Sequence, residues 1–300
     1  MSRDDQVVSD GIPGQAQEAV HLSVIVPVFN GEPFFVEQLE AIAAQECSFK
    51  WELIVVDNGS TDGSAETARR FRSRIRNLKI LSEPEPGKPA ALNTGRAAAR
   101  GRLLVLLDAD DIAAPGYLEA MAKALDAYEM VSGRMDTVRL NALGAQEEYV
   151  SPDRIRMWYG YLPHIGGGLT GIRAEAWDRI GGISPSLRVS EDIDFTWRAS
   201  RAGVSMGMAP DAVLHYRRPT RAWPNFLKGR SYGRSSVWLY QLHRTEGQPR
   251  ISLMVDLHNL RLVLHDLLHR EELWWWRVSY RLGLIEGRLE ECARQRVWYP

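Results

Sequence analysis

The chain has 300 residues, of which 45% are hydrophobic and 25% are charged, and its formal net charge at pH 7 is -1. This length and composition suffice to bury a full hydrophobic core, so we expect a globular protein with one large domain or two modest ones. The nearly balanced charge gives no reason to expect nucleic acid or another polyanion as a partner of the whole molecule.

Residues 1–20 form a polar leader without the basic flank and the apolar run of a secretory signal. No later segment approaches the roughly 20 apolar residues that a membrane span requires. Cys47 and Cys292 have neither the spacing of a metal site nor that of a disulfide framework, which fits a reducing compartment. We therefore expect a cytoplasmic protein that does not span the membrane, with peripheral contact at its inner face left open.

The first half of the chain alternates strand-like apolar runs with helix-length segments. The runs cover residues 22–29, 51–56, 78–81 and 102–107, and helices are expected to begin near residues 33, 63 and 88. Such alternation predicts an α/β fold with a mostly parallel sheet, right-handed crossovers and helices on both faces. From residue 222 onward, apolar residues three or four positions apart predict helices.

Three of the expected strands end in polar residues. The first ends in PVFN, the second runs into DNGSTDGS, and the fourth runs into DADD. Ligands of open α/β sheets bind outside the carboxyl ends of the strands. Three polar strand ends on one edge of the sheet therefore predict a ligand site there.

The acidic residues Asp108, Asp110 and Asp111 directly follow an apolar strand. Carboxylates about 4 Å apart repel one another by roughly 1 kcal/mol in water and by several times more near a protein surface, so a positive partner is expected. Hard oxygen ligands at a sharp turn suit Mg²⁺ or Mn²⁺, which shares its coordination sphere with water and a diphosphate. The alternative is that Asp110 or Asp111 caps a helix that begins near Pro115.

Seven segments of the chain together resemble a known family. They are VIVPVFNGE, LIVVDNGSTDGS, EPGKPAALNTGRAAARG, LLDADD, GIRAEAWDRIGG, SEDIDFTWRASRAG and VLHYRR. Their order and spacing are similar to those of the nucleotide-sugar glycosyltransferases of family 2, which implies the GT-A fold, a Rossmann-like, mostly parallel sheet flanked by helices. The resemblance covers about residues 21–218, with a donor half at about 21–111 and an acceptor half at about 112–218. Residues 219–300 lie outside it and are expected to form a helical C-terminal extension.

The resemblance implies a donor-binding set in the first half. Asp57 would contact the nucleoside, and Asp108 and Asp110 would form a D-x-D element that holds the ribose and the metal-bound diphosphate. The alternatives are a turn residue for Asp57 and a solvated surface lysine for Lys88. The implied donor-binding residues are Pro27, Phe29, Asn30, Glu32, Asp57, Lys88, Asn93, Asp108, Ala109 and Asp110.

Glu191 and Asp192 in SEDIDF form a second pair of carboxylates. Sugar transfer needs a base that takes the proton of the acceptor hydroxyl. The resemblance assigns this role to Asp192, with Glu191 beside it, in a single displacement that inverts the anomeric carbon. A helix start capped by Ser190 would explain the same acidic residues, and both interpretations can hold at once.

Four further residues gain a role from the resemblance. His215 would be a third metal ligand beside Asp108 and Asp110, and the alternative is a structural histidine. Trp177, Trp197 and Gly168 fall on the acceptor side, although core packing is the simpler expectation for both tryptophans.

Two short motifs imitate other sites. GGGLTG at 166–171 fits the dinucleotide pattern G-x-G-x-x-G, but a turn-rich segment follows in place of a second parallel strand. HDLLH at 265–269 has the histidine spacing of zinc proteases, but Asp266 replaces the glutamate and no third ligand is evident. We expect neither a dehydrogenase nor a zinc site.

Two segments near the C-terminus leave their roles open. Residues 217–234 carry six basic and no acidic residues, together with aromatic ones. They could cover the donor diphosphate, bind an anionic or lipid-phosphate acceptor, or form a solvated face; nucleic acid is not expected. Trp274 to Trp276 could pack in the core, between subunits of a homo-oligomer, or at a bilayer interface.

The sequence thus predicts a non-processive, inverting glycosyltransferase that depends on Mn²⁺ or Mg²⁺. We expect it to move one sugar from a nucleoside diphosphate sugar, with a UDP-sugar as the first choice, to an acceptor hydroxyl. A nucleotidyltransferase on a similar sheet and a non-catalytic sugar-nucleotide-binding protein are the alternatives.

Overall fold

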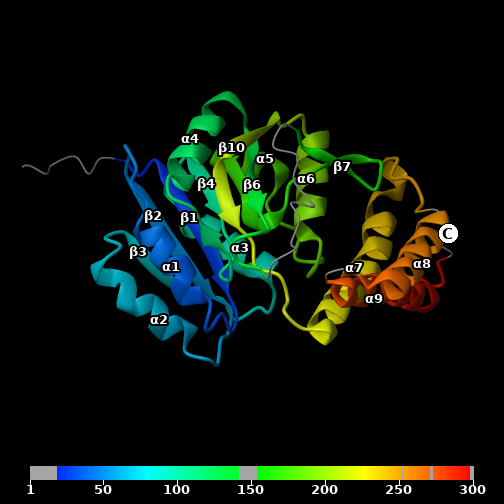
Figure 1. Ribbon diagram of the computed structural model, residues 1–300. Coiled ribbons are helices and arrows are strands. Elements are labelled where there is room, and N and C mark those ends of the chain that lie inside the picture. The colour runs from blue at the N-terminus through cyan, green and yellow to red at the C-terminus, as the bar shows by residue number, and fades with distance from the viewer. Residues whose placement is uncertain (1–18, 142–153, 252, 271–272, 298–300) are drawn as a thin grey trace, which may run out of the picture.

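The computed structural model describes residues 19–141, 154–251, 253–270 and 273–297 (Figure 1). Residues 1–18 of the expected leader lie outside this range. Two parts lie side by side, namely an α/β part with a central sheet and a group of C-terminal helices. Among the helices of the described residues, none has both the length and the apolar character that crossing a bilayer requires.

The first four strands form the parallel half of an eight-stranded sheet. β1 (Leu22–Val28) pairs in parallel with both β2 (Trp51–Asp57) and β4 (Leu103–Leu106), and β2 pairs in parallel with β3 (Leu78–Ser82). The predicted strands are confirmed, with ends that differ by one residue or less. Apolar β-branched and leucine side chains on both faces of these strands explain why the sheet is buried on both sides.

The second half of the sheet is mixed, with the overall strand order β3-β2-β1-β4-β9-β6-β10-β5. β9 (Thr170–Arg173) runs antiparallel between β4 and β6 (Met130–Asp136), and β10 (Met206–His215) runs parallel to β6. The two-residue β5 (Ile112–Ala113) closes the edge against β10. A separate hairpin, formed by β7 (Arg156–Trp158) and β8 (Leu162–His164), faces the C-terminal helices.

Helices cover both faces of the sheet because alternate strand residues point to opposite sides. Val24 of β1 packs with α1 (Phe35–Ala43) and α4 (Tyr117–Ala127), and α2 (Ser64–Arg70) joins that layer. Its neighbour Ile25 packs with α3 (Lys88–Ala98), α5 (Ala174–Ile180) and α6 (Glu191–Arg201). The helices expected near residues 33, 63 and 88 are α1, α2 and α3, so the predicted α/β class with helices on both faces is confirmed.

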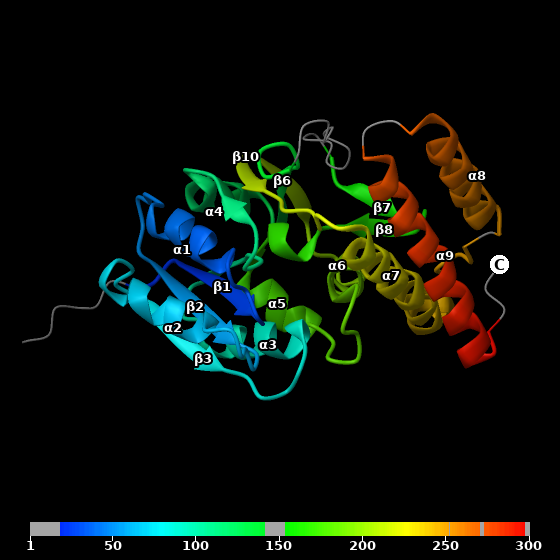
Figure 2. The ribbon, with the colours of Figure 1, turned by 60° about the horizontal axis from the view of Figure 1, so that its bottom comes forward.

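The C-terminal part consists of three helices, α7 (Ala222–His243), α8 (Leu253–His269) and α9 (Trp274–Gln295) (Figure 2). α7 and α9 approach so closely that their backbones touch at glycines. A Cβ atom on Gly233 would lie 2.2 Å from the carbonyl oxygen of Leu284, and one on Gly287 would lie 2.0 Å from that of Arg230. The predicted helical extension is therefore a tightly joined pair of helices with α8 outside it.

Candidate active site

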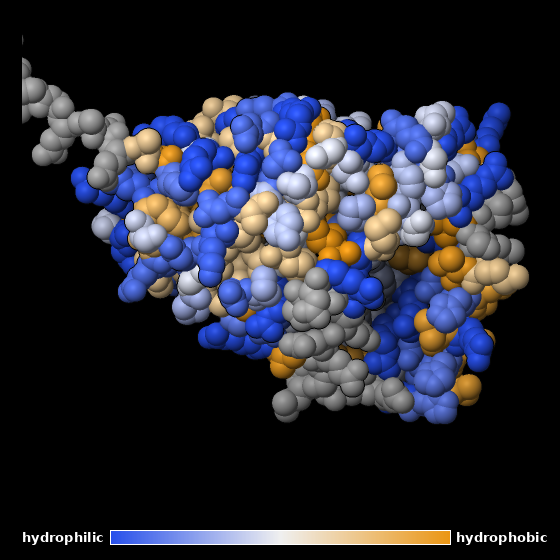
Figure 3. Space-filling view, turned by 90° about the horizontal axis from the view of Figure 1, so that it is seen from above, coloured by the Kyte–Doolittle hydropathy of each residue, from blue (hydrophilic) through white to orange (hydrophobic). Residues whose placement is uncertain are grey.

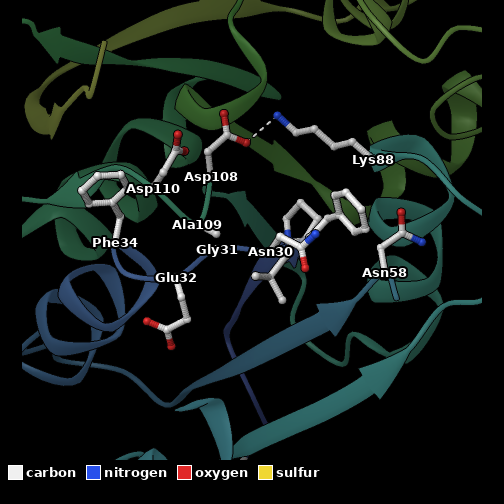
Figure 4. Close-up of a pocket in the computed structure, with 12 residues that line it drawn as sticks. Asn30, Gly31, Glu32, Phe34, Asn58, Lys88, Asp108, Ala109 and Asp110 are labelled. Atoms are coloured by element: carbon white, nitrogen blue, oxygen red, sulfur yellow. Dashed lines mark ion pairs between the residues drawn. The ribbon is translucent and has the colours of Figure 1, made fainter. Parts of the chain in front are cut away.

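A pocket of about 470 Å³ opens at the carboxyl ends of β1 and β4 (Figure 4). Eight of the ten predicted donor-binding residues line it, because both strands end on the same edge of the sheet. They are Pro27, Phe29, Asn30, Glu32, Lys88, Asp108, Ala109 and Asp110. Val28, Gly31, Phe34 and Asn58 complete the lining and were not predicted.

Hydrogen bonds between two loops shape the floor of this first pocket. Asn30 has a positive φ of 50°, a conformation that asparagine tolerates better than most residues. Its N–H donates to Ser60 Oγ at 3.0 Å, and its Oδ1 accepts from the N–H of Thr61 at 2.8 Å. The N–H of Glu32 donates to Asp62 at 2.8 Å. The loops after β1 and β2 therefore hold each other in place.

Two predicted donor-binding residues are not among the residues that line the pocket. Asp57 accepts a hydrogen bond from the N–H of Ser60 at 3.1 Å, which is the turn role considered as its alternative. Asn93 Nδ2 donates to the carbonyl oxygen of Ile183 at 2.8 Å, and Asn93 Oδ1 accepts from the N–H of Ile183 at 3.0 Å. These two bonds connect α3 to the loop after α5. The neighbour of Asp57, Asn58, reaches the pocket and receives a hydrogen bond from the N–H of Gly87 at 2.7 Å.

Lys88 supplies positive charge to the acidic end of β4. Its ammonium group forms an ion pair with Asp108, drawn as a dashed line in Figure 4, and lies 3.7 Å from a carboxylate oxygen of Glu191. Burial alone would disfavour the charged form, but these carboxylates outweigh it and raise the pKa of Lys88 above its ordinary value. Lys88 is thus a charged link between the two halves of the sheet.

Asp110 and Asp111, the other two acidic residues of DADD, form no ion pair with another residue of the described ranges. Asp110 lines the rim of the pocket, where desolvation by the surrounding protein and then the charge of Asp108 raise the pKa of its carboxyl. Burial and then the charges of Asp108 and Asp110 raise the pKa of Asp111 well above its usual range. The carboxylate of Asp111 nevertheless accepts a hydrogen bond from the N–H of Arg217 at 2.9 Å. The helix-cap alternative is wrong, because α4 begins after Gly116 with no side-chain cap.

A second pocket of about 480 Å³ shares Lys88 and Asp108 with the first. Glu191 and Asp192, at the start of α6, line it together with the glycine-rich segment 166–168. α7 contributes further side chains, among them Lys228 and Tyr232. The two carboxylate pairs predicted from separate parts of the sequence therefore meet on either side of Lys88.

The first two acidic residues of α6, Glu191 and Asp192, have opposite environments. Burial raises the pKa of Glu191 to about 7, although Lys88 partly opposes this. Burial would also raise the pKa of Asp192, but His164, Lys88 and the N–H of Gly167 outweigh it and lower this pKa to about 2. Asp192 Oδ2 accepts from that N–H at 3.0 Å and lies 3.3 Å from His164 Nε2. Asp192 is thus an oriented, ionised carboxylate.

Ser190 precedes α6 as expected, but its side chain does not cap the helix. Its φ is 63°, so the backbone turns away from the geometry of a side-chain cap, and its hydroxyl pairs with that of Ser235 on α7 at 2.6 Å. The predicted cap is therefore wrong. The serine instead connects the start of α6 to the C-terminal helices.

His215 stands apart from the pocket carboxylates. Its Nδ1 pairs with Asp136 at 2.5 Å, and its Nε2 lies 3.0 Å from a guanidinium nitrogen of Arg139. Both ring nitrogens therefore have partners within the protein. Over the described ranges, His, Cys, Asp and Glu side chains form no group of three that could hold a metal ion, and this includes His265 and His269.

The three residues expected on the acceptor side separate into two kinds. Trp177 and Trp197 are buried in hydrophobic clusters, where Trp197 packs edge-on against Tyr161, and this is the placement that core packing predicts. Gly168 lines the second pocket and lies against Asp108, because a Cβ at this position would be 2.8 Å from Asp108 Oδ2.

Several pocket residues carried only a weak sequence signal. The basic segment 217–234 was noted, and it contributes Lys228, whose ammonium group bonds to the hydroxyl of Tyr216. Arg217 lies over the ring of Phe34 at 4.1 Å and donates to the carbonyl oxygen of Asp110 at 2.9 Å. His164 had no signal at all, since nothing in the sequence places the hairpin of β7 and β8 beside α6.

Comparison with known sequences identifies the family. The model of the family "Glycosyl transferase family 2" matches residues 23–181. Glycosyltransferase AglE of Haloferax volcanii is 30% identical over 227 residues, which are 73% of this chain and 74% of AglE. The dodecaprenyl-phosphate galacturonate synthase of Rhizobium johnstonii is 35% identical over 117 residues, which are 38% of this chain and 35% of that protein.

Solved structures share the fold at low sequence identity. The mannosyltransferase PcManGT from Pyrobaculum calidifontis, in complex with GDP-Man and Mn²⁺, has a TM-score of 0.63 at 20% identity, and the match covers 93% of this chain and 89% of that one. S. aureus TarS, residues 1–349, has a TM-score of 0.55 at 19% identity over 94% and 93% of the two chains. The chain therefore belongs to glycosyltransferase family 2 and is a glycosyltransferase with the GT-A fold.

Proposed function

We propose that this enzyme moves a single sugar from a nucleoside diphosphate sugar to an acceptor hydroxyl, with inversion at the anomeric carbon. One observation carries the proposal: Asp108 of the donor half and Glu191 of the acceptor half contact the same lysine, Lys88. Two pockets meet at this point, so a donor and an acceptor have separate places on either side of it.

The first pocket is the proposed donor site, with a UDP-sugar as the expected donor. Structural neighbours were solved with UDP-GlcNAc in TarS and with GDP-Man in PcManGT. Phe29, whose side chain is largely exposed at the pocket, offers an apolar surface for a base or sugar. Asn30 offers the NH₂ of its amide beside it, and Lys88 offers positive charge for the diphosphate.

The carboxylates of Asp108 and Asp110 fit a divalent cation. Both residues follow β4 and line the first pocket, and their hard oxygen ligands suit Mg²⁺ or Mn²⁺. Such an ion, when bound, would neutralise charge on the departing diphosphate. A role for His215 as a third ligand requires Arg139 to leave its Nε2.

Asp192 is the proposed base. It is ionised and its carboxylate is oriented by Gly167, so it can accept the proton of an acceptor hydroxyl in the second pocket. As the acceptor oxygen forms its bond to the anomeric carbon, the bond from that carbon to the diphosphate oxygen breaks. The proton moves to Asp192, and the nucleoside diphosphate leaves with the bonding electrons beside Lys88.

Asp192→Asn tests this role, because the amide cannot take the proton. We expect transfer to fall by about 100-fold or more, while donor affinity stays the same. Asp211→Asn, a matched change at an exposed position of β10, should leave both unchanged. Chromatography of the nucleotide product measures the rate. Unchanged transfer in Asp192→Asn would remove the assigned base, and release of pyrophosphate by the wild type would indicate a nucleotidyltransferase.

A further inference from the structure

α8 is the outermost helix of the molecule (Figure 2). It packs mainly on α9, on the side away from the sheet. Its buried side is formed by Val263 and Asp266, which are only 3% and 6% exposed. The opposite side of the helix therefore faces outward along its whole length.

That outward side is apolar. Leu268 is 81% exposed, Met254 70% and Leu264 55%. These residues and the exposed leucines between them recur every three or four positions, which places them on one side of the helix. Hydrophobic side chains also reach the surface among hydrophilic ones at the C-terminal end of the face in Figure 3. A row of exposed leucines of this size marks an interaction surface. The outer stripe of α8 consists of Met254, Leu257, Leu260, Leu264, Leu267 and Leu268.

Within α8 (Leu253–His269), the charge that reaches the outer stripe is positive. Both aspartates of α8 turn inward, where Asp256 pairs with Arg288 at 2.6 Å and Asp266 pairs with Arg277 at 3.0 Å. The polar side chains that flank or interrupt the outer stripe on this helix are Arg261 and three exposed histidines, His258, His265 and His269. No acidic side chain of the described part of α8 accompanies them.

We propose that the outer stripe of α8 lies flat on an anionic lipid bilayer. Leucines and a methionine on one side, bordered by an arginine and three histidines, form an amphipathic surface that inserts at the headgroup level while its cation meets lipid phosphate. A long arginine side chain can reach the headgroups from within such a stripe. The helix rests on the membrane in this arrangement and does not cross it.

A second copy of the chain fits this surface less well. Arg261 stands midway between Leu253 and His269, inside the stripe. A two-fold antiparallel pairing of α8 with itself that covered the whole stripe would have its axis at the middle of the helix, so the two Arg261 side chains would face each other. Two like charges in an apolar contact repel strongly, whereas an anionic surface attracts both.

Sedimentation of the full-length enzyme with vesicles tests the proposal. We expect binding to vesicles of phosphatidylcholine with phosphatidylglycerol, weaker binding to phosphatidylcholine alone, and a decrease with salt. Leu264→Asp with Leu268→Asp should weaken binding by at least about tenfold, because buried leucines contribute most of the attraction. Leu264→Ser with Leu268→Ser, which leaves the charge unchanged, should also weaken it.

The matched control is Arg72→Ser with Arg76→Ser, at exposed positions beyond α2, which lowers the net charge by the same two units. It should bind vesicles like the wild type, and circular dichroism should show every variant folded. Absence of wild-type binding, or equal loss in the control, would overturn the proposal. So would a dimer in light scattering that the Leu264→Asp, Leu268→Asp variant dissociates, because the stripe would then join two copies.

Discussion

Lys88 explains how the protein tolerates so many carboxylates at one strand end. Its ion pair with Asp108 balances one of the three acidic residues of DADD, and its approach to Glu191 extends this balance to α6. Desolvation and then the charge of Asp108 raise the pKa of the neighbouring Asp110, which has no such ion pair with a described residue. The site is thus a cluster of carboxylates that contains one positively charged side chain, Lys88. The divalent metal ion that we propose would add a second positive charge.

We expect the Glu191–Asp192 pair to give the enzyme a pH dependence near neutrality. The pKa of Glu191 is about 7 and that of Asp192 about 2, so the pair takes up one proton as the pH falls through about 7. That proton removes negative charge beside Asp192 and makes it a weaker base. We expect kcat/KM to fall below pH 7 in the wild type and to be low and flat in Glu191→Gln over roughly pH 6 to 8. An unchanged slope in the variant would contradict this assignment.

The raised pKa of Glu191 also makes the stability of the protein depend on pH, in a direction that can be stated. This pKa is raised from an ordinary value of 4.5, so the folded protein binds more protons than the unfolded chain between about pH 4.5 and 7. The contribution of Glu191 to the free energy of unfolding therefore decreases as the pH rises through this window. Glu191→Gln should lack this part of the slope, and thermal melts at several pH values measure it.

Gly168 is where a single methyl group reaches the acidic cluster. In Gly168→Ala the new Cβ would be 2.8 Å from Oδ2 and 3.0 Å from Cγ of Asp108, so the carboxylate that pairs with Lys88 must shift. We expect donor affinity to fall by about tenfold. In Gly166→Ala the nearest atom would be 3.7 Å away, on Leu169, and affinity should stay the same. Titration calorimetry with a nucleoside diphosphate compares the two; equal affinities would show that Asp108 can give way.

Site residues could be predicted from the sequence where a motif fixes their position in the fold by itself. DADD follows a strand, so its carboxylates reach the sheet edge whatever the rest of the fold. Asn93 and His215 could not be placed this way, because their partners, Ile183 and Asp136, come from distant segments. A polar side chain forms hydrogen bonds with whichever partner the tertiary fold brings close to it. The sequence alone does not show which distant residue that will be.

At the scale of elements, the parallel half was predictable and the antiparallel strand was not. β1 to β4 are apolar runs separated by helices, a pattern that fixes their direction. β9 has only four residues, TGIR, and lies between β4 and β6, which are far from it in sequence. No local pattern indicates that a short segment will be inserted between two strands.

The close contact between α7 and α9 follows from the spacing of glycines in both helices. Gly229 and Gly233 are four residues apart, as are Gly283 and Gly287, and this spacing puts each pair on one face of its helix. Small residues at this spacing let two helix backbones approach closely. The extension is therefore held by backbone contact as well as by ion pairs such as Arg234 with Glu290.

Gly233→Ala should consequently destabilise the protein. The added methyl group would be 2.2 Å from the carbonyl oxygen of Leu284, which is backbone and cannot rotate away. We expect the free energy of unfolding to fall by about 1–3 kcal/mol and Tm by several degrees. Ala293→Leu, which adds bulk at an exposed position of α9, should change it by less than about 0.5 kcal/mol. Equal melting curves would mean that the helices can separate without cost.

Across the whole molecule, the C-terminal helices support the catalytic ones. His243 of α7 is buried and contacts Asp194 of α6 at 3.0 Å, two residues beyond the proposed base. Ser235 pairs with Ser190 at the start of the same helix. α7 therefore both lines the second pocket and holds α6. The sequence left the first of these roles open for residues 217–234, and it gave no indication of the second, because the contacting residues of the two helices are far apart in the chain.

The central claim is that one edge of the sheet binds a nucleoside diphosphate together with a divalent cation. Titration calorimetry of the wild type and Asp110→Asn with UDP and GDP, with and without Mn²⁺, tests it most directly. We predict that one of the nucleotides binds the wild type only when Mn²⁺ is present, and that Asp110→Asn loses this dependence together with most of the affinity. Binding that is equally tight without the metal and without the Asp110 carboxylate would contradict the account.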